Sequence, residues 1–167
     1  ASSVGAGGTV SVTNTGTVDT KTGVAISAQA DQAVTVDNTG ALNTTALGST
    51  AAVGIAAGTV TGVVKVDNTG QIGAAGAGNG VDAFGIFAFA AGGANTVTVN
   101  NSGNIFVDAG GTAGILAVSG GTGDVVVNNT GVIDPPAFGI LMVGGGNVTA
   151  NTAGNVTCDT GIQVTSL

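Results

Sequence analysis

A nine-residue phrase of the form V-x-V-x-N-x-G-x-(I/V/L) recurs along this chain and constrains its fold more than any other feature. Five copies are complete and a sixth is degenerate; in chain order they begin at Val10, Val34, Val64, Val97, Val125 and Val148. A second phrase, in which a glycine precedes isoleucine or valine and a short apolar run, follows each copy, with its glycine at Gly23, Gly54, Gly85, Gly114, Gly139 and Gly161. Like phrases return every 23 to 33 residues, so the 167 residues form one array of repeats.

The alternation within the first phrase predicts its local structure. Apolar and polar residues alternate with period two, and Val and Thr are β-branched, which is typical of a strand with one buried face. Helices are disfavoured because 32 of the 167 residues are glycine. Like phrases lie too far apart for tight hairpins, whereas parallel stacking places like positions over one another at a spacing of about 4.8 Å. We therefore predict an all-β parallel β-solenoid of about six coils, with residues 10–167 as its single domain and residues 1–9 as a flexible N-terminal segment.

Stacking also assigns a role to the asparagine of the first phrase. In the phase that turns the two valines inward, this asparagine also points inward, at a corner of the coil. A buried amide must be hydrogen-bonded, and stacked amides can bond along the axis. We predict a structural ladder of these residues, Asn14, Asn38, Asn68, Asn101 and Asn129. The glycine two residues later, as in Gly40 and Gly70, is expected to adopt a positive φ at the turn.

The composition excludes several classes of function. The chain carries two lysines and nine aspartates, giving a net charge of −7, so it lacks the cations that nucleic-acid binding requires. It contains no histidine, arginine or glutamate, which removes an imidazole base, a Ser-His or Cys-His pair and a His-ligated metal site. We expect neither an enzyme nor catalytic residues, and no bound cofactor. The longest nearly apolar stretch, residues 84–93, is far shorter than the roughly 20 residues of a transmembrane helix, so no transmembrane segment is expected.

Two carboxylates are the one candidate for a metal site. Asp37 and Asp67 occupy the same outward position in successive copies of the first phrase, with Lys65 two residues before Asp67. The simplest interpretation is that Lys65 relieves the repulsion between two stacked surface carboxylates. Clustered carboxylates also suit Ca²⁺, so a calcium site at Asp37 and Asp67 is the alternative hypothesis, with only Asn and Thr of adjacent coils as further ligands.

The second phrase predicts an apolar strip on the outside of the solenoid. If its isoleucines turn inward, large apolar side chains of three neighbouring coils point outward: Phe87, Phe89, Leu116, Val118, Leu141 and Val143. Either a loop such as residues 73–84 folds over this strip, or the strip is a protein interface. We take the six residues as the candidate interface. The lone cysteine, Cys158, is expected to pack in the stack as a small apolar residue rather than to cross-link chains.

The recurring VDNTG and VNNTG phrases with their trailing GI segments resemble the right-handed parallel β-helix passengers of autotransporter adhesins and related bacterial surface proteins. The resemblance covers essentially the whole chain. It implies a right-handed parallel β-helix that lies outside the cell or on the bacterial surface. It transfers no catalytic residues, and such passengers include adhesins, aggregation factors and plain stalks.

These expectations together predict a non-enzymatic, secreted or surface-displayed solenoid with a structural or adhesive role, as in a biofilm matrix. The sequence shows no capping helix or charged repeat at either terminal coil, so we expect head-to-tail homopolymers that form extracellular filaments, with other cell-surface or matrix components as further partners. The alternatives are the excised stalk of a longer autotransporter passenger, and a carbohydrate- or ice-binding module. The last would use an outward hydroxyl row formed by Thr15, Thr39, Thr69, Ser102 and Thr130.

Overall fold

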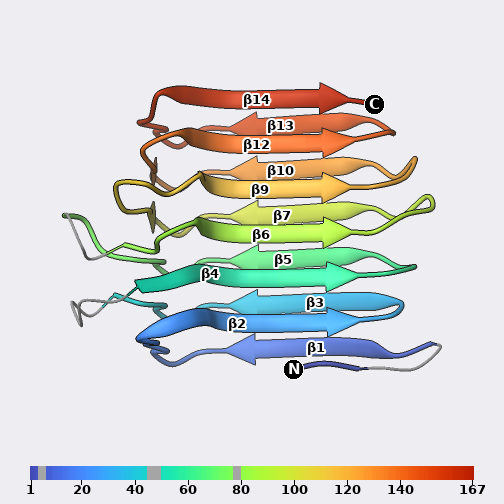
Figure 1. Ribbon diagram of the computed structural model, residues 1–167, viewed down its shortest axis with the longest axis horizontal. Helices are drawn as coiled ribbons and strands as arrows, with labels where there is room; N and C mark the ends of the chain where they lie inside the picture. The colour runs from blue at the N-terminus through green and yellow to red at the C-terminus, as the bar shows by residue number, and fades with distance from the viewer. Residues whose placement is uncertain (4–6, 45–49, 77–79) are drawn as a thin grey trace.

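Two parallel six-stranded sheets face one another across the core (Figure 1). The computed structural model describes residues 1–3, 7–44, 50–76 and 80–167. The first sheet, named here the valine sheet, consists in spatial order of β1 (Thr9–Asn14), β3 (Ala33–Asn38), β5 (Val64–Asn68), β7 (Val97–Asn101), β10 (Val125–Asn129) and β13 (Val148–Thr152). The second, the isoleucine sheet, consists of β2 (Thr22–Ala30), β4 (Thr50–Thr59), β6 (Phe84–Ala90), β9 (Ala113–Ser119), β12 (Phe138–Gly144) and β14 (Thr160–Ser166). Two short strands, β8 (Ile105–Phe106) and β11 (Ile133–Asp134), pair with each other on a third side of the coil.

The register of the valine sheet follows the repeat. Val34 lies opposite Val64 and Asn38 opposite Asn68, and equivalent positions pair in the same way along the whole sheet. The parallel β-solenoid predicted from the repeat is therefore confirmed, and the described ranges contain no helix. It follows that no described segment is a helix of the length and apolar character needed to cross a membrane.

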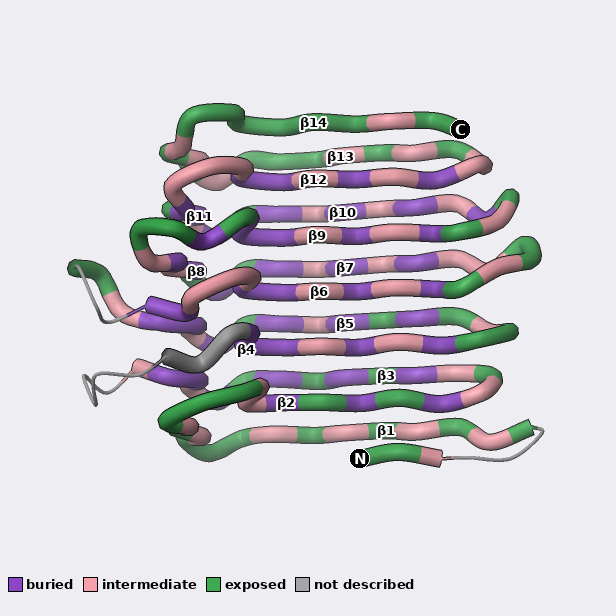
Figure 2. Tube along the Cα trace, viewed as in Figure 1, coloured by how far each residue is buried: buried purple, intermediate pink, exposed green. Residues whose placement is uncertain are grey.

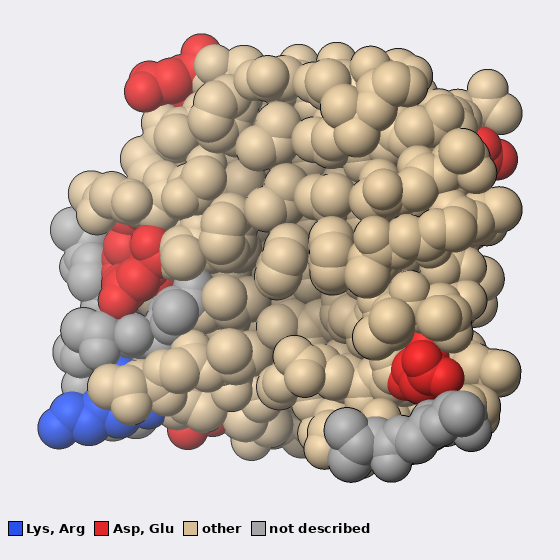
Figure 3. Space-filling view, turned by 45° about the vertical axis from the view of Figure 1, so that its right-hand side comes forward, with Lys and Arg blue, Asp and Glu red and all other residues tan. Residues whose placement is uncertain are grey.

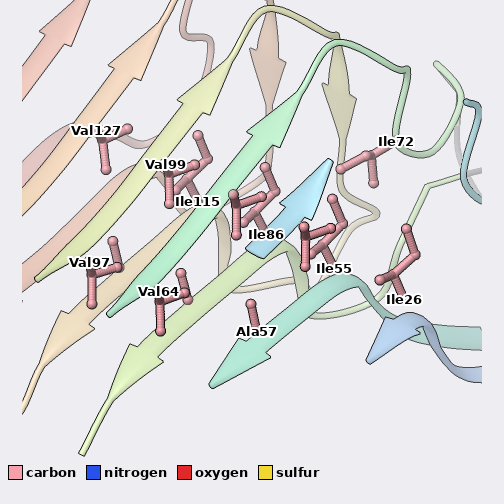
Figure 4. Close-up of a cluster of buried hydrophobic side chains, with 14 of the residues drawn as sticks. Ile26, Ile55, Ala57, Val64, Ile72, Ile86, Val97, Val99, Ile115 and Val127 are labelled. Atoms are coloured by element: carbon pink, nitrogen blue, oxygen red, sulfur yellow. The ribbon is translucent and has the colours of Figure 1, made fainter. Parts of the chain in front are cut away.

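Columns of like residues fill the core between the sheets (Figure 4). Ile55, Ile86 and Ile115 pair in register along the isoleucine sheet and are completely buried. A third column closes the side of the coil through parallel bridges between Val18, Leu42, Ile72, Ile105, Ile133 and Val156. Burying one such side chain contributes about 1.5–3 kcal/mol, so these columns are the main source of stability.

The sequence pattern places Gly23 and Gly54 at the same position of the second phrase, and this alignment is wrong for the first copy. β2 pairs Ile26, and not Val24, with Ile55, and the register shifts between Gly23 and Val24. Gly23 has a φ of 94°, a conformation that favours glycine, so it serves the irregularity in this strand rather than the stacking of the repeat. The counterpart of Gly54 in the first coil is Ala25.

The glycine two residues after each ladder asparagine has a steric role. The positive φ expected for it is wrong, because the described glycines with positive φ are Gly7, Gly23, Gly73, Gly76, Gly93 and Gly110. A Cβ atom at Gly40, Gly70 or Gly103 would instead lie within 3.0 Å of the carbonyl oxygen of the equivalent glycine one coil earlier. Glycine is required at this corner because the backbones of successive coils approach so closely.

The N-terminal residues lie against the first coil. Ser2 forms a parallel bridge with Gln29 of β2, and the Ser3 N–H donates to the Gln29 carbonyl oxygen at 2.9 Å. Residues 4–6 of the expected flexible segment lie outside the described residues, and the first strand begins at Thr9.

Candidate functional site

The five ladder asparagines form a continuous line of hydrogen bonds along the solenoid axis. From Asn14 to Asn101, each Nδ2 donates to Oδ1 of the asparagine in the next coil at 2.7–2.8 Å. Each of the five amides also donates to the carbonyl oxygen of the glycine two residues later, at 2.8–2.9 Å. All but Asn14 are buried, so the line satisfies amides that water does not reach. Asn129 ends it by donating to the Thr152 hydroxyl at 3.3 Å.

A second amide row runs along the outside of the same corner and donates in the opposite direction. Asn151 donates to Asn128 at 2.9 Å, Asn128 to Asn100 at 2.8 Å, and Asn100 to the carboxylate of Asp67 at 2.7 Å. The sequence shows the row, because its members stand one place before the ladder position. Its hydrogen bonds were not predicted, since outward amides on a strand have no obligatory partner.

Asp37 and Asp67 lie opposite each other in β3 and β5. Lys65 forms an ion pair with Asp67, and the two side chains are 52% and 31% exposed. Burial raises the pKa of Asp67, but hydrogen bonds from Asn100 and Lys65 outweigh it, so the pKa lies below its ordinary value. Within the described residues, no three or more His, Cys, Asp or Glu side chains gather in a way that could hold a metal ion. The calcium site at Asp37 and Asp67 stays a prediction.

Exposed hydroxyls lie beside the outer amide row. Thr69, Ser102 and Thr130 line a shallow hollow over β5, β7 and β10, together with Asp67 and the neighbouring asparagines. The hydroxyl row ends at Ala153 in the next coil. The hollow offers hydrogen-bonding groups, and its described lining contains no aromatic side chain on which a sugar ring could stack.

The candidate interface residues point away from the core on the isoleucine sheet. Phe87 lies opposite Leu116, which lies opposite Leu141, and a second column contains Phe89, Val118 and Val143. All six are partly exposed, whereas the isoleucines on the inward face of the same strands are buried. The rings of Phe84 and Phe87 stack with centroids 5.7 Å apart, and those of Phe87 and Phe89 are 6.3 Å apart. The strip is therefore two straight apolar columns with an aromatic end.

Residues 73–84, the loop considered as a cover for this strip, pair elsewhere in their described parts. The Gly73 N–H donates to the Leu42 carbonyl oxygen at 2.8 Å, and Val81 forms a parallel bridge with Val107. Both contacts lie on the third side of the coil. Residues 77–79 of this loop lie outside the described residues.

The last coil exposes positions that are buried in the coils before it (Figure 2). Ile162 and Val164 of β14 lie opposite Ile140 and Met142, both completely buried. The exposed fractions of Ile162 and Val164 are 40% and 46%. Strands β13 and β14 each have a strand partner on only one edge. This end of the described solenoid thus presents both apolar side chains and free strand edges.

Cys158 is a half-buried free thiol next to this coil. Its Sγ donates to the Thr160 carbonyl oxygen at 3.2 Å. Burial raises the pKa of the thiol, and the negative charges of Asp159 and Asp134 add to the increase. A thiol with a raised pKa is a poor nucleophile, which agrees with the packing role expected from the sequence.

Comparison of the chain with protein-family models, with curated proteins and with solved structures finds no match.

Proposed function

We propose that this chain is a non-enzymatic structural β-solenoid, secreted or displayed on a bacterial surface, whose copies join end to end into extracellular filaments. The observation that carries the proposal is the exposure of Ile162 and Val164 at positions that preceding coils bury. Unpaired strand edges and apolar side chains are the features that a further coil would cover. The sequence contains no histidine, arginine or glutamate for catalysis, so the proposal includes neither a reaction nor a cofactor.

The first coil has apolar residues at the positions that match those of the last coil. If the register of both sheets continued across a junction between two copies, Val148 would lie on Val10 and Ile162 on Ile26. Val10 and Val148 are only partly buried, so a second copy would complete their burial. Such a head-to-tail contact repeats without closing and gives a filament.

The polar rows also match across that junction. The inner ladder ends on the Thr152 hydroxyl, which donates to the Gly154 carbonyl oxygen at a long 3.4 Å, and it begins at Asn14. In the junction this hydroxyl would donate to Oδ1 of Asn14 instead. The outer row donates in the opposite direction, so Oδ1 of Asn151 could accept from the hydroxyl of Thr13. Each amide at the junction would thus meet one hydroxyl donor, which favours this register over a shifted one.

Residues 1–3 occupy part of the edge that this junction would use. The Gln29 N–H donates to the Ala1 carbonyl oxygen at 3.1 Å, and the Ser3 N–H donates to the Gln29 carbonyl oxygen. End-to-end joining therefore requires this short segment to leave β2, after which it could add to a strand edge of the neighbouring copy.

The alternative is that a further coil of the same polypeptide covers the exposed row. The chain would then be part of the stalk of a longer passenger, as its resemblance to autotransporter adhesins implies. The exposed hydroxyl row beside the outer amides favours a third, carbohydrate- or ice-binding function, although this row is broken at Ala153.

The test compares two lysine substitutions by sedimentation and electron microscopy. Val164→Lys places a charge on the exposed edge, whereas Val60→Lys places it in the turn after β4, where Val60 is 58% exposed. We expect the wild type and Val60→Lys to form filaments as concentration rises, and Val164→Lys to remain short with an unchanged β-sheet spectrum. A wild type without filaments at its highest soluble concentration would support the longer passenger, and filaments of Val164→Lys would reject the proposed junction.

A further inference from the structure

The outer face of the isoleucine sheet carries no charge. None of the residues in β2, β4, β6, β9, β12 and β14 is charged, although the chain has a net charge of −7. Figure 3 shows the charged groups toward the left and right sides and the lower edge of the visible surface, with a broad uncharged region between them. On an uncharged face, two copies of an acidic chain can meet without bringing aspartates together.

The side chains on this face follow a fixed order along the axis. From β2 to β14, the first outward column reads Ser27, Ala56, Phe87, Leu116, Leu141 and Gln163. The second column reads Gln29, Gly58, Phe89, Val118, Val143 and Thr165. Both columns are polar at the two ends, small at β4 and large from β6 to β12.

We propose that this face binds a second copy of the chain in a two-fold dimer whose stacking order is reversed. The two-fold axis lies between the two facing sheets, parallel to the strands and midway between β6 and β9. Under this symmetry β6 faces β9 of the other copy, β4 faces β12, and β2 faces β14. The contact is isologous, so it closes as a dimer, and it uses none of the groups proposed for end-to-end joining.

The sizes of the side chains select this arrangement. In the reversed order the small residues Ala56 and Gly58 receive the large Leu141 and Val143, and Phe87 meets Leu116 at the centre. The polar Ser27 would meet Gln163 at the rim, which gives an apolar core with a polar border, as in stable interfaces. With the same order in both copies, Ala56 would instead face Gly58 and leave a gap beside crowded phenylalanines.

The shape of the sheet fits such packing. The strands in Figure 1 lie nearly parallel with little twist along the stack. Flat sheets of many strands are typically stabilised by stacking against another sheet, at a distance of about 10 Å. The outward columns are therefore able to interlock along the full height of both copies.

Pairs of introduced cysteines test the arrangement in a Cys158→Ser background. Facing sheets lie about 10 Å apart, which is too far for a disulfide between them, so a bifunctional thiol reagent with a short spacer is used to join the cysteines. In the reversed dimer, residue 56 of one copy faces residue 141 of the other, so Ala56→Cys with Leu141→Cys should give a covalent dimer with this reagent. The single variants should give none. The control pair Ala56→Cys with Gly58→Cys should cross-link two chains only if the stacking order is the same in both copies. Within one chain, two strands separate β4 from β12, so positions 56 and 141 lie about 14 Å apart and the short spacer does not join them.

Sedimentation of variants of the 167-residue chain provides a second measurement that depends on no cross-link. Phe87→Ser with Leu116→Ser should raise the dimer dissociation constant about tenfold or more with an unchanged β-sheet spectrum, whereas Ser27→Ala should leave it nearly unchanged. A covalent dimer with the 56/141 pair alone supports the proposal. Cross-linking of two chains by the 56/58 pair, no cross-linking at all, or a lateral dimer insensitive to Phe87→Ser with Leu116→Ser overturns it.

Discussion

At the scale of single residues, the interior ladder asparagines differ from ordinary buried amides because each is hydrogen-bonded to the coil before it and to the coil after it. The Nδ2 group of Asn68 donates both to Asn101 in the next coil and to Gly70 in its own turn, and its Oδ1 accepts from Asn38. The side chain is 1% exposed, so water does not replace any of these partners. A single substitution therefore leaves unpaired groups in three places.

Asn68→Ala should lower the free energy of unfolding by about 2–4 kcal/mol, because a buried donor and two buried acceptors lose their partners. Asn151→Ala is the matched control, since Asn151 is an exposed amide that makes one axial hydrogen bond. It should change stability by about 0.5 kcal/mol or less. Denaturant unfolding followed by circular dichroism measures both changes. Equal losses in the two variants would show that the inner ladder has no special role.

At the scale of one element, the four middle strands of the isoleucine sheet, β4, β6, β9 and β12, each contain a glycine that packs against a side chain of the third column. A Cβ atom at Gly85 would lie within 3.0 Å of the Ile105 side chain and of the Gly114 carbonyl oxygen. Gly54, Gly114 and Gly139 have equivalent neighbours. Because these glycines have no side chain, the isoleucine sheet can approach the third side of the coil closely. The second phrase of one repeat thereby packs against the end of the first phrase.

Gly85→Ala should destabilise the protein by about 1–3 kcal/mol, because the methyl group overpacks a closely packed corner. Gly161→Ala is the control at the same position of the last coil, where a Cβ atom would meet nothing within 4 Å. Its stability should be unchanged or slightly higher, since alanine restricts the unfolded chain. Thermal unfolding of both variants checks the prediction, and a tolerated Gly85→Ala would contradict the proposed packing.

The elements also show how far the sequence could predict this molecule. Period-two alternation and repeat spacing predicted the valine sheet and its register, because stacking forces like residues onto like positions. The sequence of the second phrase leaves its phase open, and the structure turns its isoleucines inward. The alignment of β2 was wrong because Gly23 resembles the repeated glycine but lies at a register shift with positive φ. The role of Gly40 was also misjudged, since close approach between coils depends on neighbours that are distant in sequence. The donor direction of the outer amide row likewise depends on neighbours that are distant in sequence, and it was not predicted.

At the scale of the whole molecule, the two proposed contacts use separate groups. End-to-end joining would cover strand edges and inward side chains at the terminal coils, and it would add backbone hydrogen bonds. The lateral dimer would cover only outward side chains of the isoleucine sheet, whose interior strands already have a partner on both edges. Filaments could therefore pair laterally without either contact disturbing the other.

Amide hydrogen exchange can separate these contacts. Stability in a stacked array is approximately a sum of terms between neighbouring coils, so opening begins where a coil has one neighbour. In the monomer we expect exchange to be fastest in β13 and β14, where Ile162 and Val164 are exposed, and slowest in β6, β7 and β9.

End-to-end joining should slow exchange in β14 and in the β1 edge, because new backbone hydrogen bonds form there. Lateral pairing should leave these edges unchanged. Uniform protection in the monomer would contradict opening from the ends, and slowed exchange of β14 in a purely lateral dimer would show that the two contacts are not independent.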